Sequence, residues 1–330
     1  MKLFTIILII SMASLQSCHT DPKIVPELSD CPTINDLIDM LDDSGEFGIG
    51  GDIFIGADSG ITCVNYVPGN NDEFICYYSG YLSNYTSTLV KYNLVTKEFE
   101  SILVEPDILS LPNISSTGWL IFTGSNYQLW KVKTNGDSLT QITFNGSNFE
   151  STWSPDGERI IYAQDYPVGT YNTVIVDKNG NFLFSILGSY KIRKPTWSPD
   201  GRFIACSNFN GYYTDIDLID TTTWEVENLI NGNNVFTEQI KSIDFFPDSK
   251  HLLWATDTEL RKTNIETKVT EVIATTCDSQ GFDEINISDD GQTIIVKKTI
   301  YSYFDSKHIL LSARAFMLDA NGNEIKEIIL

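Results

Sequence analysis

The chain has 330 residues and a formal net charge of −22, because 44 acidic residues oppose only 22 lysines and arginines. No basic cluster interrupts this excess, so nucleic acid and anionic lipid headgroups are poor partners on electrostatic grounds. The three histidines, His19, His251 and His308, are far apart in the sequence, and neither a nucleophile elbow nor a phosphate-binding loop is present. We therefore predict no catalytic residue, no metal site and no cofactor.

Residues 1–17 have the pattern of a bacterial signal peptide. A basic start is followed by an apolar run, Leu3 to Ile10, that is too short to span a bilayer. The segment Leu15-Gln16-Ser17-Cys18 resembles a lipobox of the kind found in Bacteroidota, which implies that Cys18 is the lipidation site and becomes the first mature residue. The alternative is an ordinary signal peptide followed by an incidental cysteine.

The lipobox implies a location in the cell envelope, with the membrane contacted only through the lipid anchor. Two or three acyl chains hold a protein firmly on a bilayer, whereas one chain gives marginal binding. His19 follows the lipidated cysteine, and by resemblance to the sorting rule of enteric bacteria it implies the outer membrane. The sequence leaves open whether the protein faces the periplasm or is displayed on the cell surface.

Residues 18–60 form a separate N-terminal arm. We predict a tether up to about Leu28 and then a short helix capped by Thr33. The helix would carry one apolar face, made by Ile34, Leu37, Ile38 and Leu41. The segment Asp52–Ile55 is a candidate closing strand for the domain that follows.

A five-residue phrase that occurs twice defines the rest of the chain. It reads Trp153-Ser154-Pro155-Asp156-Gly157 and returns as Trp197-Ser198-Pro199-Asp200-Gly201, each time before an apolar run. Weaker copies give turn-closing positions at 71, 118, 157, 201, 249 and 291, which are 39 to 48 residues apart. This period is typical of the four-stranded blades of a propeller, at roughly 40–45 residues each.

Each repeat has the pattern of four short antiparallel strands. Pro, Asp and Gly form the first turn, so the aspartates are interpreted as turn formers. An Asn-Gly hairpin joins the third strand to the fourth, as in Asp177–Asn181 and Asp319–Asn323. Six such units fill residues 61–330, which predicts an all-β, six-bladed β-propeller with only short, protected sheet edges.

The turns and the run from Gln128 to Gly136 resemble the TolB-like family of six-bladed propellers. The resemblance covers residues 61–330 and implies a fold rather than a function. TolB has a separate α/β domain at its N-terminus, where this chain has only the short arm, so the role of TolB with Pal does not carry over.

Five cysteines remain besides Cys18. Cys76 and Cys206 occupy the same position of their repeats, in mid-strand, and are interpreted as core residues between blades. Cys63 would lie opposite Cys76 in a hairpin centred near Gly69, which would allow a cross-strand bridge. Cys31 and Cys277 could instead join the arm to the last blade.

Nine of the fifteen tyrosines fall in the predicted loops between second and third strands, on the face opposite the Pro-Asp-Gly turns. Tyrosine suits interfaces and sugar rings because it combines a flat apolar ring with a hydrogen-bonding tip. These candidate ligand-binding residues are Tyr81, Tyr85, Tyr127, Tyr166, Tyr171, Tyr212, Tyr213, Tyr301 and Tyr303. Alternatively, the loops extend the strands and the tyrosines pack locally.

The sequence therefore predicts a non-catalytic envelope lipoprotein that uses its propeller as a binding platform for a protein or a glycan. One alternative is an enzyme that acts on polysaccharide or peptide through carboxylates at the propeller channel. Another is a subunit of an envelope assembly complex. Converging acids in the channel would favour the enzyme, and a lining of tyrosine and asparagine would favour binding.

Overall fold

The computed structural model describes residues 60–79, 86–106, 108–110, 112–167, 171–186, 192–209, 214–232, 239–276, 280–304 and 307–328. The signal peptide, the tether, the predicted helix, the candidate closing strand and the cysteines Cys31 and Cys277 lie outside these residues. No helix in the described ranges has the length and apolar character that a membrane crossing requires.

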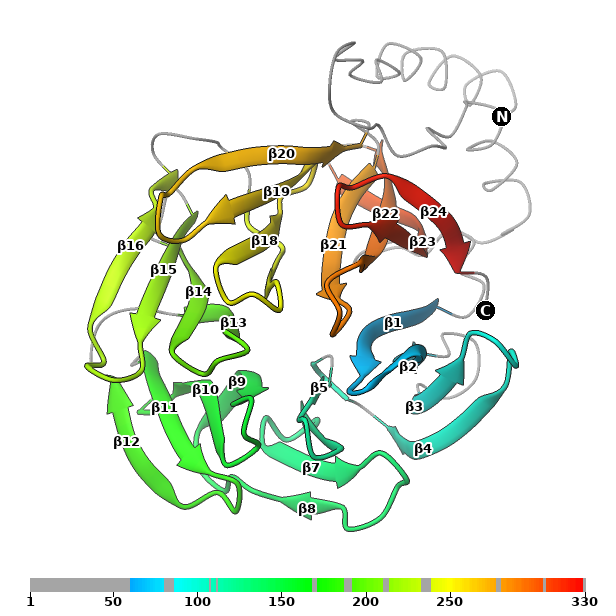
Figure 1. Cartoon of the computed structure of the whole chain (residues 1–330). Helices are drawn as coiled ribbons and strands as arrows, with labels where there is room; N and C mark the ends of the chain where they lie inside the picture. Colours follow the sequence, from blue (N-terminus) through cyan, green and yellow to red (C-terminus); the bar gives the residue numbers. More distant parts are fainter. Residues whose placement is uncertain are drawn as a thin grey trace.

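Six four-stranded antiparallel sheets are arranged in a ring, each built from four consecutive strands (Figure 1). The first three blades are β1 (Gly60–Val67), β2 (Asn70–Ser79), β3 (Thr86–Asn93) and β4 (Phe99–Pro106); β5 (Asn113–Ile114), β6 (Trp119–Thr123), β7 (Leu129–Lys133) and β8 (Thr140–Gln141); and β9 (Ser147–Trp153), β10 (Arg159–Asp165), β11 (Tyr171–Asp177) and β12 (Phe182–Ile186).

The other three blades follow the same order around the ring. They are β13 (Ile192–Trp197), β14 (Phe203–Phe209), β15 (Thr214–Asp220) and β16 (Val226–Ile230); β17 (Ser242–Phe245), β18 (His251–Ala255), β19 (Glu259–Asn264) and β20 (Thr270–Thr275); and β21 (Gln280–Ile287), β22 (Thr293–Phe304), β23 (Lys307–Asp319) and β24 (Glu324–Ile328). The predicted six-bladed propeller is confirmed, and the last blade contains all four of its own strands.

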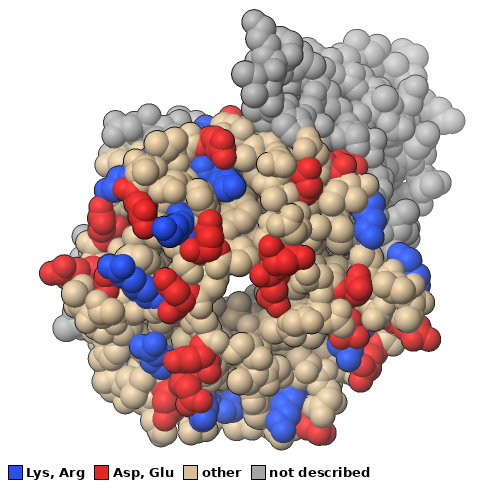
Figure 2. Space-filling model, viewed as in Figure 1, with Lys and Arg blue, Asp and Glu red and all other residues tan. Residues whose placement is uncertain are grey.

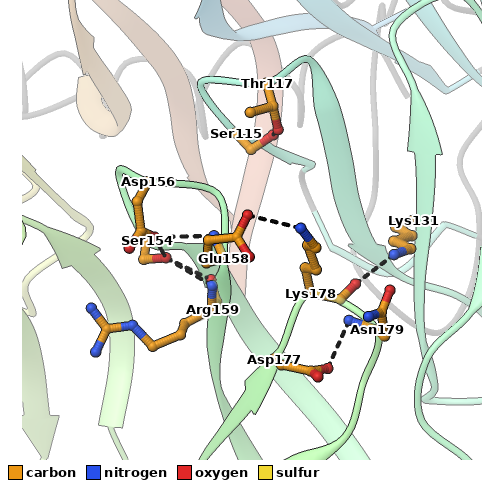
Figure 3. A network of polar contacts seen from close by, with 10 residues as sticks. All are labelled: Ser115, Thr117, Lys131, Ser154, Asp156, Glu158, Arg159, Asp177, Lys178 and Asn179. Carbon is orange, nitrogen blue, oxygen red and sulfur yellow. Dashed lines mark hydrogen bonds and ion pairs between the residues drawn. The ribbon is translucent and has the colours of Figure 1, made fainter.

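The repeated Pro-Asp-Gly turn is held by its own serine and aspartate. Ser154 Oγ donates to Asp156 Oδ1 at 2.5 Å and accepts from the Arg159 backbone N–H at 2.9 Å (Figure 3). Asp156 also accepts from the Glu158 N–H at 3.0 Å, and Gly157 closes the turn with a φ of 68°. The same bonds recur at Ser198 and Ser288, so the turn aspartates have the structural role that the sequence predicted.

The first blade departs from the predicted register. Its turn residue with positive φ is Gly69 rather than Asn71, and β2 already begins at Asn70. The β1–β2 hairpin absorbs the difference with a register shift between Tyr66 and Val67. Beyond this irregularity, Phe74 pairs with Tyr66 in the way that Ile160 pairs with Trp153.

The second strand of each blade is the buried one, because it lies in the middle of the sheet and is covered by both neighbouring blades. The side chain at one repeated mid-strand position is buried in every blade: Cys76, Thr123, Tyr162, Cys206, Trp254 and Val296. Apolar residues from adjacent blades form shared clusters here, such as Ile161 and Ile175 with Ile204 and Cys206. The core is therefore divided among the seams between blades.

The interpretation of Cys76 and Cys206 as core residues is confirmed. Cys76 and Cys206 are both buried, and Cys206 is a free thiol. Cys63 is paired directly opposite Cys76 across β1 and β2, and Cys76 is disulfide-bonded. Cys76 is thus a bridged core residue, whereas its counterpart Cys206 remains a thiol whose pKa is raised by burial.

A polar channel as the candidate functional site

A channel runs along the ring axis, and its opening is visible at the centre of the space-filling view (Figure 2). On the side of the Pro-Asp-Gly turns it widens into a turn-face chamber of about 290 Å³, and on the opposite side into a loop-face chamber of about 360 Å³. The two chambers share one ring of residues, here named the waist ring: Asn65, Asn113, Thr152, Thr196, Asp244 and Asn286.

Each waist-ring residue comes from the first strand of a different blade, at the position directly before the Tyr, Trp, Phe or Ile that precedes the turn. Several of them bind the neighbouring blade. Asn113 Oδ1 accepts from the Trp153 N–H at 3.0 Å, and Asn286 Oδ1 accepts from the Tyr66 N–H at 3.0 Å. These residues therefore join the seams and line the channel with amides and hydroxyls.

Asp244 is the only acid in the waist ring. Its carboxylate accepts from the backbone N–H groups of Ile287 at 2.8 Å and Phe245 at 2.9 Å, and Asn286 Nδ2 lies 3.4 Å from it. Burial raises the pKa of Asp244 to about 7, although these donors favour the ionised form. At neutral pH this carboxyl can therefore both donate and accept hydrogen bonds.

A second tier of polar side chains lines the loop-face chamber two residues before the waist ring. Four consecutive blades supply Glu150, Lys194, Ser242 and Glu284. In three of these blades the tier coincides with a register shift between the first and second strands. Glu150 and Lys194 also have positive φ values of 53° and 51°, which is uncommon for residues with long side chains. The bulges thus re-aim these side chains relative to a regular strand.

An ion pair crosses part of the loop-face chamber. Lys194 Nζ lies 2.7 Å from Glu284 Oε1, which joins the fourth blade to the sixth past Ser242 of the fifth. Burial lowers the pKa of Lys194, but the charges of Glu284 and Glu150 outweigh it and raise that pKa above its usual range. Burial raises the pKa of Glu284, which Lys194 only partly offsets. Each charge of this pair therefore compensates for the burial of the other.

An aromatic wall lies on the other side of the chamber. Phe149 lines it, half-buried, and packs edge-on against Tyr127 with ring centroids 5.5 Å apart. The preceding residue, Asn148, is fully buried and donates through Nδ2 to Thr143 Oγ1 and the Asn145 carbonyl, while its Oδ1 accepts from Gln164 at 2.9 Å. This network fixes the backbone that carries Phe149.

The structure places the predicted tyrosines only in part. Tyr127 and Tyr166 lie between second and third strands, as expected, after β6 and β10, and are 46% and 53% exposed. Tyr171 is the first residue of β11. Tyr301 and Tyr303 were expected in a loop, which is wrong: β22 continues through Phe304, so both lie in a strand. Tyr81, Tyr85, Tyr212 and Tyr213 lie outside the described residues. None of the nine tyrosines is among the described residues that line either chamber.

The described residues contain no group of three or more His, Cys, Asp or Glu side chains placed to hold a metal ion. His251 lies at the fifth blade's turn, where its Nδ1 is 2.6 Å from Asp248 Oδ2. His308 lies in β23. The chemistry of the described channel therefore rests on amides, hydroxyls, carboxyls and one ammonium group.

The sequence-based interpretation missed the waist ring and the second tier, although a signal for both was present. The residue before the repeated Trp-Ser-Pro is Thr in both strong copies, Thr152 and Thr196. Extending that column to the weaker copies gives Asn113, Asp244 and Asn286, and the column two residues earlier gives the second tier. In the first blade the predicted turn at Asn71 points to Tyr66 instead of Asn65. Polar residues in the middle of a strand that adjoins the channel axis mark the lining.

Comparison with solved structures agrees with this architecture. A TolB structure from Agrobacterium tumefaciens is 17% identical over 74% of this chain and 88% of that one, with a TM-score of 0.61. TolB from Acinetobacter baumannii is 21% identical with a TM-score of 0.52, over 64% of this chain and only 53% of that one. A chain of a nidogen/laminin complex is 11% identical over 78% and 94%, with a TM-score of 0.57.

The sequence itself matches no protein-family model and no curated protein. At identities this low the structural likeness shows the fold alone. The protein is a six-bladed β-propeller. More particularly, its fold is similar to that of the TolB propellers, which is the resemblance that the repeated turns predicted.

Proposed function

We propose that the protein is an envelope lipoprotein whose propeller is a non-catalytic binding platform for a protein or a glycan, with the channel as its binding site. The observation that carries this proposal is the waist ring, in which five of the six side chains are neutral amides or hydroxyls. Such groups orient a ligand through hydrogen bonds without supplying a nucleophile or an acid–base pair. A lining of tyrosine and asparagine was expected for a binding protein; the three asparagines of the waist ring support this role, whereas Tyr66 is the one tyrosine among the described lining residues.

The charged groups of the loop-face chamber support the same proposal. Glu284 is paired with Lys194, and the neighbouring Asp283 is paired with Lys297 at 2.7 Å. Burial raises the pKa of Asp283, but Lys297 outweighs it and keeps that pKa below its usual value. Carboxylates held in ion pairs with lysines are better suited to supporting the geometry of a site than to transferring protons.

The test is site-specific photocrosslinking in native membranes. A photoreactive amino acid in place of Glu150 reports on the channel, and one in place of Val95, which is 70% exposed on the first blade, serves as the matched outer control. We expect an adduct with an envelope protein or glycan at position 150 and none at 95. Equal labelling at both positions would place binding away from the channel.

The enzyme alternative is favoured by the raised pKa values of Asp244 and Glu284 within the channel, both caused by burial. If it holds, the purified protein turns over envelope polysaccharides or peptides, and Asp244→Asn abolishes that turnover. An assembly subunit would instead co-purify in fixed stoichiometry with its complex.

The lipid anchor is tested separately. Labelling of growing cells with a radioactive fatty acid should mark the wild-type protein and not Cys18→Ala. Protease treatment of intact cells then distinguishes the outer surface from the periplasm.

A further inference from the structure

Two unlike walls face each other across the loop-face chamber. Phe149 in β9 belongs to the third blade and Glu284 in β21 to the sixth, which lie on opposite sides of the ring (Figure 1). Phe149 and Leu109 supply apolar surface, whereas Lys194, Ser242 and Glu284 supply an ammonium, a hydroxyl and a carboxylate. A ligand that fits both walls has one apolar face and an edge rich in hydrogen-bonding groups.

The aromatic wall is preorganised. Tyr127 supports the edge of Phe149, and the buried network of Asn148 fixes the adjacent backbone. Little side-chain entropy is therefore lost when a ligand packs on this ring. Phe149 can act as a rigid platform.

The polar wall contains an internal ion pair, and Glu150 adds a second carboxylate to the same chamber. Glu284 Oε1 is occupied by Lys194 at 2.7 Å, and the Lys194 backbone N–H donates to Glu150 at 3.3 Å. A cationic ligand would compete with Lys194 for Glu284, and an anionic ligand would meet Glu150 and Glu284 together. Neutral hydroxyls can instead donate to the remaining carboxylate lone pairs and accept from the ammonium without breaking the pair.

We propose that the loop-face chamber binds an uncharged sugar, with Phe149 stacked against the apolar face of the ring and Lys194, Ser242 and Glu284 bonded to its hydroxyls. The proposal rests on the channel being a binding site and specifies its ligand. The cavity of about 360 Å³ lies near the lower end of the range for small-ligand pockets, roughly 300–1,000 Å³, so it admits a short saccharide rather than a folded domain.

The experiment uses the full chain on an array of neutral, acidic and amino-sugar oligosaccharides, followed by calorimetry with the best neutral binder. We expect binding of at least one neutral saccharide that is little affected by salt. Phe149→Leu, which keeps apolar volume but lacks the flat ring, should weaken binding at least 10-fold. Phe149→Trp should retain affinity within about 3-fold, because it keeps the platform.

Phe144→Ala is the matched control, because Phe144 is 73% exposed and is not among the described residues that line the chamber. Its affinity should equal that of the wild type. Ser242→Ala gives a second readout if Phe149→Leu is unstable: loss of a hydroxyl that bonds the sugar should weaken binding of the neutral saccharide by about 3-fold or more.

Three outcomes would overturn the sugar assignment: no neutral saccharide binds, only charged saccharides bind, or Phe149→Leu binds as the wild type does. If no saccharide on the array binds and a protein is crosslinked at position 150, the sugar proposal is rejected but the proposed function as a binding platform stands. Turnover of a bound saccharide would instead reject the non-catalytic function.

Discussion

At the residue scale, Asp244 is subject to opposing influences. Burial favours its neutral form and raises its pKa to about 7 from an ordinary 3.8, while the amides of Phe245 and Ile287 favour its ionised form. Between pH 4 and 7 the folded protein therefore retains a proton on this carboxyl that the unfolded chain releases. The contribution of Asp244 to stability must fall as the pH rises through that window.

The prediction is that Asp244→Asn, which cannot ionise, gains stability relative to the wild type as the pH rises from 4 to 7. The relative gain should amount to about 1–3 kcal/mol and level off above pH 8. Thermal unfolding of both proteins across pH 4–8 measures it. Parallel stability curves would show that Asp244 titrates normally.

The ion pair between Lys194 and Glu284 gives a second prediction at the residue scale. Lys194→Met leaves the Glu284 carboxylate without its cation. We expect a loss of about 1–3 kcal/mol, less than for a fully buried pair because the lysine and glutamate side chains are 33% and 17% exposed. Glu284→Gln should cost a similar amount. The double variant should recover part of the loss, and denaturant unfolding of all four proteins gives the coupling energy. Additive costs would mean that the pair contributes no mutual stabilisation.

At the element scale, the turns and hairpins could be predicted because their chemistry is local. Pro, Asp, Asn and Gly each favour one backbone conformation, so a five-residue phrase is enough to place them. Gly180 shows what remains hidden: it needs positive φ, as the sequence suggests, but it also packs on the carbonyl of Ile142 in the preceding blade. That contact depends on blade packing, which no short segment encodes.

This difference can be measured with two glycines. An added Cβ at Gly180 would lie 2.5 Å from the Ile142 carbonyl oxygen, whereas at Gly201 nothing lies within 4 Å. Both Gly180→Ala and Gly201→Ala strain a positive φ at about 1–2 kcal/mol. We expect Gly180→Ala to cost about 1–3 kcal/mol more, because the neighbouring blade must shift. Equal melting temperatures for the two variants would contradict this packing role.

The channel lining, too, could be predicted from the sequence only in part. Thr152 and Thr196 could be placed on inward strands from the repeat alone, but the bulges that re-aim Glu150 and Lys194 depend on how adjacent strands twist around the ring. The tyrosine-rich loops were predicted as the binding face because residue composition can be read from the sequence, whereas the position of a bulge cannot.

At the scale of the whole molecule, the ring is closed between the first and sixth blades without a shared strand among the described residues. The seam is made by side chains: Gly69 N–H donates to Asp289 at 2.6 Å, and the Tyr66 hydroxyl bonds Thr293 Oγ1 at 2.8 Å. A buried cluster that includes Phe74 and Met317 fills it. No described backbone segment crosses this seam, so it should be the first to open.

Asn286 and Asn113 make a matched pair for testing ring closure, because each accepts a backbone N–H from the next blade at 3.0 Å. Replacing either by Ala should cost about 1–2 kcal/mol, with the greater loss in Asn286→Ala because Asn286 Nδ2 also lies 3.4 Å from Asp244 Oδ2. The two variants should differ in which residues exchange their amide hydrogens faster. Hydrogen exchange in Asn286→Ala should rise throughout the first and sixth blades, since among the described residues no backbone segment connects these two blades and limits the opening. In Asn113→Ala the connection between β8 and β9 should confine the rise to residues near β5 and β9. Indistinguishable exchange patterns would mean that the ring opens as one cooperative unit.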